Sequence, residues 1–472
     1  MAGKFLSLFK PVGRILLEIK KPTRKVSFNE KIFWTALVLV IFLVMAQIPL
    51  YGINSSENSQ YTQMNVIFAS NKGTLMELGI GPIVTAGLIL QLLVGSSIIK
   101  CDMSNPEDRS LFTSASKVFS IGLTAVQAGT YILGGMYGSL NPLVMLVIFF
   151  QLLITGIFVM LLDELLQKGW GLGSGISLFI MAGVAQHILW SMFSPVGGYG
   201  LFVGGLSALL EGSKTTFEWV VGTANGMPSL VGFIATIIVF IIIIYVQGIR
   251  VELPITYAGY KGFRSRYPIK LLYVSNLPVI FAGALFANVF FFTQLLWNRF
   301  GQSSSAMFSW FFRIFGNYNI TAEGAIECVG GLAHYVSPPA GLINVAHDPV
   351  RALVYLGILL VFCAIFSLTW LEVGGLGPSK VAQQLMSSGM QIPGYRRSEK
   401  PIEQILRRYI PVVTVLGGII VGLIAGLADF LGVFGSGTGI LLSVGIIYQY
   451  YELLMRERAA EMFPAFRSIL GE

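Results

Sequence analysis

Side chains that could ligate a metal or act as nucleophiles are few in this chain and stand far apart. The histidines are His187, His334 and His347, and the cysteines are Cys101, Cys328 and Cys363. None shows the spacing of a zinc site, and the cysteines form neither a CxxC pair nor a disulfide framework. No Walker motif, nucleophile elbow or HExxH occurs. We therefore expect no catalysis and no cofactor, and structural roles for the three histidines.

Carboxylates within apolar stretches would indicate ion or substrate binding. The stretches hold almost none, and Asp163 and Asp429 lie at their ends. The nearby GLGSGIS, at 171–177, is not a phosphate loop, because it lacks GxxxxGK[ST]. An intramembrane enzyme would need paired aspartates, a Ser/His pair or a metal triad, and we find none. An inverted-repeat secondary transporter stays open as an alternative.

Composition indicates a membrane protein. The chain has 472 residues, of which 54% are hydrophobic and 11% charged, whereas soluble domains carry about 25% charged residues. A helix needs about 20 apolar residues to cross a bilayer. We expect an all-α polytopic membrane protein with ten transmembrane helices, at 32–51, 75–97, 118–136, 144–162, 176–193, 230–245, 271–296, 352–371, 410–431 and 439–454.

Basic residues are distributed unevenly over the two sides that these spans define. The side of both termini carries 26 of the 31 lysines and arginines, so the positive-inside rule places both termini in the cytosol. The expected cytosolic parts are an amphipathic helix and linker at 1–31, basic loops at 247–270 and 372–408, and a tail at 457–472. Residues 194–229 form the external linker between the halves.

The stretch 53–97 interrupts the alternation of spans and loops. The polar run NSSENSQYTQ precedes an apolar piece, 64–70, which as a helix would cross only about a third of a bilayer. One interpretation is a re-entrant segment that lines a cavity, because irregular backbone at membrane depth needs protein or water around it. The other is a surface loop before an ordinary span, and the residues alone do not separate the two.

Short motifs recur in the same order in the two halves of the chain. The matched positions are Pro82/Pro278, Ala86/Ala282, Gly87/Gly283 and the runs GLGSGISLF and GSGTGILLS, which follow Asp163 and Asp429. The matches divide the chain into halves of five spans, 32–193 and 230–456. Because five is odd, the halves have opposite orientations, and inverted repeats place a pathway at their interface.

Bulky, uncharged side chains occupy the broken spans. They are Ile80, Val84, Ile176, Ile180, Ile280 and Leu442. An apolar constriction excludes water and binds no ion tightly, so such residues could seal a pathway and yield to a passing chain. Ordinary packing or lipid contact would equally explain each of them.

Longer runs are more specific than these motifs. They are GTLMELGIGPIVTAGLILQLLVG, LDELLQKGWGLGSGISLF, RVELPITYAGYKGFRSRYPIKLLYVSNLPVI and GSGTGILL. Together they resemble the SecY family, more narrowly the alpha subunit of archaeal and eukaryotic protein-conducting translocons. The resemblance runs from the N-terminal helix through span 10 and is weakest in 297–349. It implies a clamshell of two inverted five-helix halves, a plug at about 54–72 and a lateral gate between spans 2–3 and 7–8.

The resemblance also implies a function. Such a channel passes secretory polypeptides across the membrane and releases transmembrane segments into lipid. Its partners would be two small single-span subunits, beta and a SecE-like gamma, together with ribosomes and their RNA, signal peptides, nascent chains and membrane lipids. The location would be the endoplasmic reticulum membrane, with the archaeal plasma membrane as the alternative.

Individual residues match family positions. The six apolar side chains above match the pore ring. Thr85, Gln127 and Asn288 match a polar cluster at the lateral gate, where interhelical hydrogen bonds contribute about 0.6 kcal/mol or somewhat more each. Lys261 and Arg396 match ribosome contacts in the basic loops, which suit RNA phosphates. Lys261 replaces an expected arginine and lacks its bidentate geometry. Helix packing and positive-inside bias remain the plain alternatives.

Overall fold

The computed structural model describes residues 18–24, 26–52, 73–95, 98–99, 101, 105–133, 137, 141–195, 200–212, 215–223, 227–257, 264–274, 276–300, 306–320, 326–339, 341–374, 376–387, 390–391 and 399–462. It divides into two compact units. Unit 1 comprises Met1–Trp190, Ala287–His334 and Leu442–Glu472, and unit 2 comprises Ser191–Phe286 and Tyr335–Leu441.

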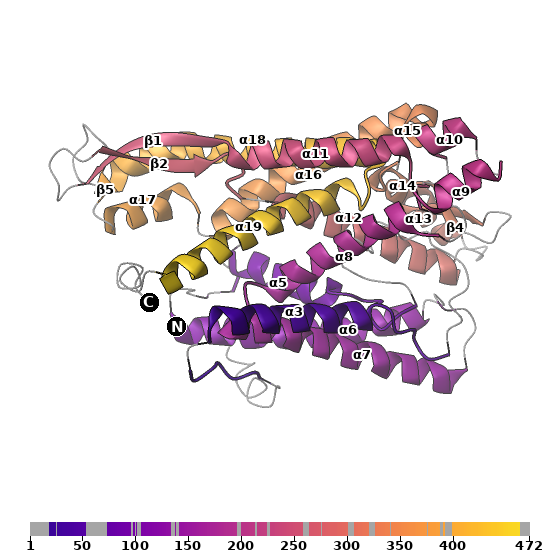
Figure 1. Cartoon of the computed structure of the whole chain (residues 1–472), viewed down its shortest axis with the longest axis horizontal. Helices are drawn as coiled ribbons and strands as arrows, with labels where there is room; N and C mark the ends of the chain where they lie inside the picture. Colours follow the sequence, from indigo (N-terminus) through magenta and orange to yellow (C-terminus); the bar gives the residue numbers. More distant parts are fainter. Residues whose placement is uncertain are drawn as a thin grey trace. The chain divides into compact units, whose positions relative to one another are not determined.

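Each segment expected to cross the membrane contains a helix (Figure 1). The helices are α3 (Phe28–Met45), α5 (Gly81–Gly95), α6 (Pro106–Leu133), α7 (Pro142–Leu165), α8 (Gly175–Phe193), α11 (Leu230–Gly248), α12 (Leu277–Phe300), α16 (Pro349–Val373), α18 (Glu399–Phe430) and α19 (Gly437–Met462). Among the described residues, eight helices are long and apolar enough to cross a bilayer. The other two of the ten are α5, which is apolar but shorter, and α6, whose first turn carries Glu107 and Asp108.

In unit 1, α6 packs against α5 and α7. Their core contains Ala128 and Ile132 of α6 and Ile148 and Leu152 of α7. It also contains Leu50 and Leu78, which flank the expected plug on its two sides in the sequence. The amide of Leu50 donates to the carbonyl of Gly73 at 2.9 Å, and that of Leu75 donates to Ile48 at 2.9 Å. The two ends of the plug segment are therefore bound to each other. Residues 54–72 themselves lie outside the described part of the chain.

The polar segment after α12 contains short elements rather than a plain loop. In unit 1 these are α13 (Ala306–Phe315) and the antiparallel strands β3 (Asn317–Ile320) and β4 (Ile326–Gly330). Helix α14 (Leu332–Val336) follows, and the chain passes into unit 2 within it, after His334. Tyr318 is buried, and its hydroxyl lies 2.7 Å from Thr293 Oγ1 of α12. His334 Nδ1 lies 2.9 Å from the carbonyl oxygen of Cys328. This contact gives His334 a structural role.

Unit 2 is built on the close pair α16 and α18. Glycines on α18 let the two backbones approach, as small residues do in membrane helix pairs. A Cβ at Gly418 would lie 2.0 Å from Ser367 Oγ, and one at Gly426 would lie 2.6 Å from Leu356 Cδ1. The unit also contains α11 and the shorter helices α9 (Gly204–Leu210), α10 (Thr216–Val221) and α15 (Leu342–His347).

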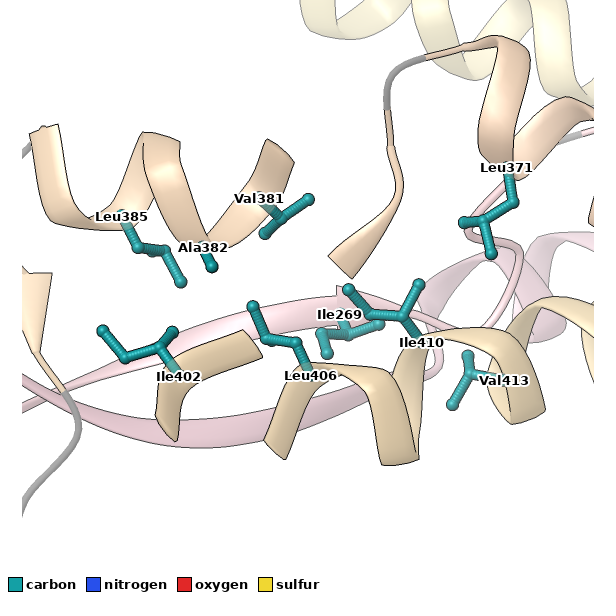
Figure 2. Close-up of a cluster of buried hydrophobic side chains, with 9 residues drawn as sticks. All are labelled: Ile269, Leu371, Val381, Ala382, Leu385, Ile402, Leu406, Ile410 and Val413. Carbon is teal, nitrogen blue, oxygen red and sulfur yellow. The ribbon is translucent and has the colours of Figure 1, made fainter. Parts of the chain in front are cut away.

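The loops expected at 247–270 and 372–408 fold together. Strand β1 (Arg250–Tyr257) pairs antiparallel with β2 (Arg264–Lys270), and β5 (Met390–Gln391) pairs with the end of β1. Helix α17 (Pro378–Ser387) packs against α18. Figure 2 shows the buried side chains that join these elements: Ile269, Leu371, Val381, Ala382, Leu385, Ile402, Leu406, Ile410 and Val413. We call β1, β2, β5, α17 and residues 399–413 of α18 the platform.

Candidate functional site

The junction between α7 and α8 is organised by Asp163, which is buried. The chain leaves α7 through the π-helical turn η1 (Leu166–Trp170) and enters α8 at Gly175. Asp163 Oδ1 accepts a hydrogen bond from the amide of Ile176 at 3.0 Å and one from Ser174 Oγ at 3.4 Å. Its Oδ2 accepts one from Gln167 Nε2 at 2.7 Å. One carboxylate thus holds the first turn of α8.

Asp429 makes the corresponding junction between α18 and α19 and is also buried. Its Oδ1 accepts a hydrogen bond from the amide of Gly437, the first residue of α19, at 2.7 Å. Its Oδ2 accepts one from the hydroxyl of Tyr355 in α16 at 3.4 Å. Ser436, just before α19, has a positive φ of 63°, and its Oγ accepts from the amide of Gly439 at 3.1 Å. Helix ends leave four N–H groups without intrahelical partners, and these contacts satisfy part of that need.

The six residues expected to form the ring lie at or near the starts of four helices. Ile80 immediately precedes α5, which contains Val84. Ile176 and Ile180 lie in the first two turns of α8, Ile280 in the first turn of α12, and Leu442 in the second turn of α19. Ile80, Ile180 and Leu442 are buried, whereas the other three are half-buried. Ile280 belongs to unit 2 and the rest to unit 1, so their closure into one ring stays a prediction.

Asn276 is a residue that sequence reasoning missed. It is buried at the start of α12, and its Nδ2 donates to the carbonyl of Leu441 in α19 at 3.0 Å. Leu441 precedes Leu442, and Asn276 precedes Ile280 by one helical turn. Asn276 therefore ties together the starts of two helices that carry ring positions. Its signal in the sequence is a polar residue just before Pro278, where an apolar span was expected.

The three expected gate residues lie in unit 1. Thr85 is on α5 and Gln127 on α6, two helices that pack together, and Asn288 is on α12. All three are half-buried. Thr85 Oγ1 has no hydrogen-bond partner among the described residues. A direct polar link among the three side chains stays a prediction.

The expected ribosome contacts Lys261 and Arg396 both lie outside the described residues. In the sequence, Lys261 falls between β1 and β2, and Arg396 falls between β5 and α18. Some of the other basic residues are already paired. Arg266 Nη1 lies 2.6 Å from Glu252 Oε2 across the β1–β2 hairpin.

A network of charges near the α7–α8 junction was also missed. Lys117 Nζ lies 2.6 Å from Glu164 Oε1, and Lys168 Nζ lies 2.9 Å from the same oxygen. Lys168 also contacts Glu18, and this hydrogen bond holds the pKa of Glu18 below its ordinary value. The indole N–H of Trp170 donates to the carbonyl of Lys20 at 2.9 Å. The chain before α3 is thus bound to the start of the junction.

Among the described residues, no group of three or more His, Cys, Asp or Glu side chains could hold a metal ion. The site residues described above lie mainly at the starts of helices. Apolar helices begin at glycine-rich breaks, and buried carboxylates hold two of those beginnings. These are features of a helical membrane protein with broken spans that line a pathway.

Comparisons with known proteins identify the family. A model of the SecY family matches residues 74–451, and a model of the plug domain of Sec61p matches residues 40–73. A solved structure described as a protein-conducting channel is 39% identical to this chain, covers 97% of it and 98% of its own length, and has a TM-score of 0.80. The chain belongs to the SecY family.

Two further structures are similar over nearly the whole chain. One is Sec61 in the canine ribosome–channel complex from the endoplasmic reticulum, at 38% identity over 97% of this chain and 98% of its own, with a TM-score of 0.78. The other is the idle yeast Ssh1 complex bound to the yeast 80S ribosome, at 27% identity over 94% and 93%, with a TM-score of 0.74. These matches confirm the expected SecY-type fold with a plug segment, and the described residues are mostly helical, with short strands outside the long helices.

Proposed function

We propose that this chain is the pore-forming subunit of a protein translocation channel. It passes secretory polypeptides across a membrane and releases transmembrane segments into lipid through a lateral gate. The observation that carries the proposal is the tandem match of a plug-domain model and a SecY model over residues 40–451. The hydrogen bonds between residues 48–50 and 73–75 support it, because they hold together the two ends of the segment that the plug-domain model matches.

The buried carboxylates argue against an ion-coupled transporter. Both oxygens of Asp163 and both of Asp429 accept hydrogen bonds from the protein. A transporter needs intramembrane charges that are free to bind an ion or substrate. These two acids are engaged in holding helices, so neither is available for such a site. We also propose that the chain is not an enzyme, since its family consists of protein-conducting channels.

The proposed partners follow from the similar structures, in which Sec61 and Ssh1 are bound to ribosomes. We assign ribosome docking to the platform, whose two parent loops carry 11 lysines and arginines, because clustered cations suit an RNA phosphate surface. Two small single-span subunits complete the channel in the endoplasmic reticulum membrane. Both termini face the cytosol, and the halves 32–193 and 230–456 are inverted relative to each other.

Reconstitution tests this function. The chain, purified with its two small subunits and placed in proteoliposomes, should protect a ribosome-bound secretory precursor from added protease. The matched control is the same precursor with the apolar core of its signal replaced by polar residues, which should remain accessible. Equal accessibility of both precursors, with the channel correctly inserted, would overturn the proposal.

A further inference from the structure

The last helix of each half starts on a carboxylate from the helix before it. In both junctions one oxygen accepts a backbone amide of the first turn, and the other accepts a polar side chain, Gln167 or Tyr355. We propose that Asp163 and Asp429 are positioning residues. They fix the position of α8 and α19 along their axes and the rotation of each helix about its axis, and thereby place the ring side chains Ile176 and Leu442. This inference rests on the proposed channel function.

The hydrogen bond between Asp163 and Ile176 links a carboxylate directly to a ring residue. The amide that Asp163 holds belongs to the ring residue itself, at 3.0 Å. In α19 the held residue is Gly437. Leu442 follows it by five residues, which is about 7.5 Å along a helix. The residue held by the carboxylate is therefore the ring residue itself in α8 and lies within two turns of it in α19, so the carboxylate controls where each side chain meets the pathway.

Glycine makes the two junctions tight. A Cβ at Gly175 would lie 2.7 Å from the Cα of Asp163, and one at Gly437 would lie 2.1 Å from the carbonyl oxygen of Ala425. Real Cβ atoms do not approach backbone so closely. Each final helix thus begins in backbone contact with the helix before it, and a carboxylate locks that contact. The arrangement occurs at both junctions, although Asp163 and Asp429 are far apart in the sequence.

If the carboxylate is removed, water cannot readily replace it as the acceptor for the buried N–H group. A buried N–H without a partner is costly where no water reaches it, so the first turn unwinds or shifts to find one. The ring side chains attached to that turn move with it. A constriction that seals by excluding water then admits water and ions.

The test compares Asp163→Ala and Asp429→Ala with Asp163→Asn and Asp429→Asn in the complete channel complex. Asparagine keeps one acceptor oxygen, the amide of Gln167 can turn to offer its own oxygen, and the hydroxyl of Tyr355 can accept. Thr414→Val is the matched control, because buried Thr414 on α18 donates only within its own helix among the described contacts. Asp163→Ser and Asp429→Ser, whose hydroxyls are too short to reach, replace the alanine variants if those fail to insert.

Two measurements are made on inserted protein. Hydrogen exchange of the peptides 174–182 and 436–444 should become about tenfold faster in the alanine or serine variants, the usual effect of losing a capping bond. Ion conductance of the resting channel in planar bilayers should rise in the same variants. The asparagine variants and Thr414→Val should match the wild type in both measurements.

Unchanged exchange in the alanine and serine variants overturns the inference. Faster exchange with a tight resting channel also overturns it, provided that Ile80→Ser, Ile176→Ser and Ile280→Ser together make the channel conduct. If that ring variant stays tight, the ring assignment fails and the inference fails with it. Normal precursor translocation in the same preparation would still uphold the proposed function, so the two failures are distinguishable.

Discussion

Replacing Leu406 tests whether the buried core holds the platform together. Leu406 is fully buried among the apolar side chains that join β2, α17 and α18 (Figure 2). Replacing a buried leucine by alanine costs about 2–5 kcal/mol, since contacts are lost and a cavity remains. At tenfold per 1.36 kcal/mol, the equilibrium for opening the platform should shift by a factor of about 30 or more.

The matched control is Leu416→Ala on the same helix. Leu416 is 48% exposed, so the same substitution removes few protein contacts. Hydrogen exchange of β1 and β2 should rise strongly in Leu406→Ala and stay at the wild-type level in Leu416→Ala. Because we assign ribosome docking to this platform, ribosome affinity should fall in Leu406→Ala alone.

Two results would refute this reasoning at different points. Equal protection of β1 and β2 in both variants would mean that the apolar core does not hold the two loops together. Lost protection with an unchanged ribosome affinity would mean that the core is real and that the ribosome docks elsewhere. Circular dichroism of both variants checks that the transmembrane helices remain folded.

Three further predictions concern the ring, the gate and the docking charges. The resting channel should conduct ions in planar bilayers when it carries Ile80→Ser, Ile176→Ser and Ile280→Ser together, because a polar constriction stays wet. Conductance should rise further when residues 58–66 are also deleted. A triple variant that does not conduct would show that these residues do not form the constriction. Asn288→Leu should shift how apolar a signal must be to open the channel, because it removes a polar group worth about 0.6 kcal/mol or more between helices; a graded series of signals with an unshifted threshold would contradict it. Lys261→Glu with Arg396→Glu should weaken ribosome binding and flatten its salt dependence by roughly one unit of slope per lost phosphate contact; an unchanged salt series would argue against both contacts.

The spans could be predicted from the sequence because hydropathy is a local property of the chain. Hydropathy does not locate the start of a helix where the apolar residues before it form turns. Span 2 was expected from residue 75, yet α5 begins at Gly81, and residues 73–80 form turns in which Gly79 has a φ of 53°. LMELGI is apolar enough for a helix, but its glycine and the following GP favour a break.

The platform could not be predicted because it depends on contacts distant in the sequence. The alternation of apolar and polar residues in RVELPITY is typical of a strand. Its partner β5 lies more than a hundred residues later and has only two residues, Met390 and Gln391. Both loops are rich in lysine and arginine, and the buried core that Ile269 and Leu385 share depends on contacts that the sequence does not show.

Polar residues with structural roles were missed for a different reason. Glu164 follows Asp163 directly, and DELLQKGWG was expected to be a loop. The structure continues α7 to Leu165 and adds the π-helical turn η1, so that Glu164 is still helical and pairs with Lys117 of α6. Asn276 carries no motif at all, and its role depends on where the carbonyl of Leu441 lies. Neither partner could be inferred without the packing of the helices.

The repeat itself was visible in the sequence, but its register was not. The matched motifs align Gly175 with Gly439, whereas α8 begins at Gly175 and α19 at Gly437. A helix that begins inside a membrane protein must satisfy its free N–H groups without bulk water. A carboxylate from the preceding helix meets part of this need at both junctions, with different spacings in the sequence. What the two halves share is therefore a carboxylate that binds a backbone amide at the start of the last helix, although the aligned glycines do not both begin a helix.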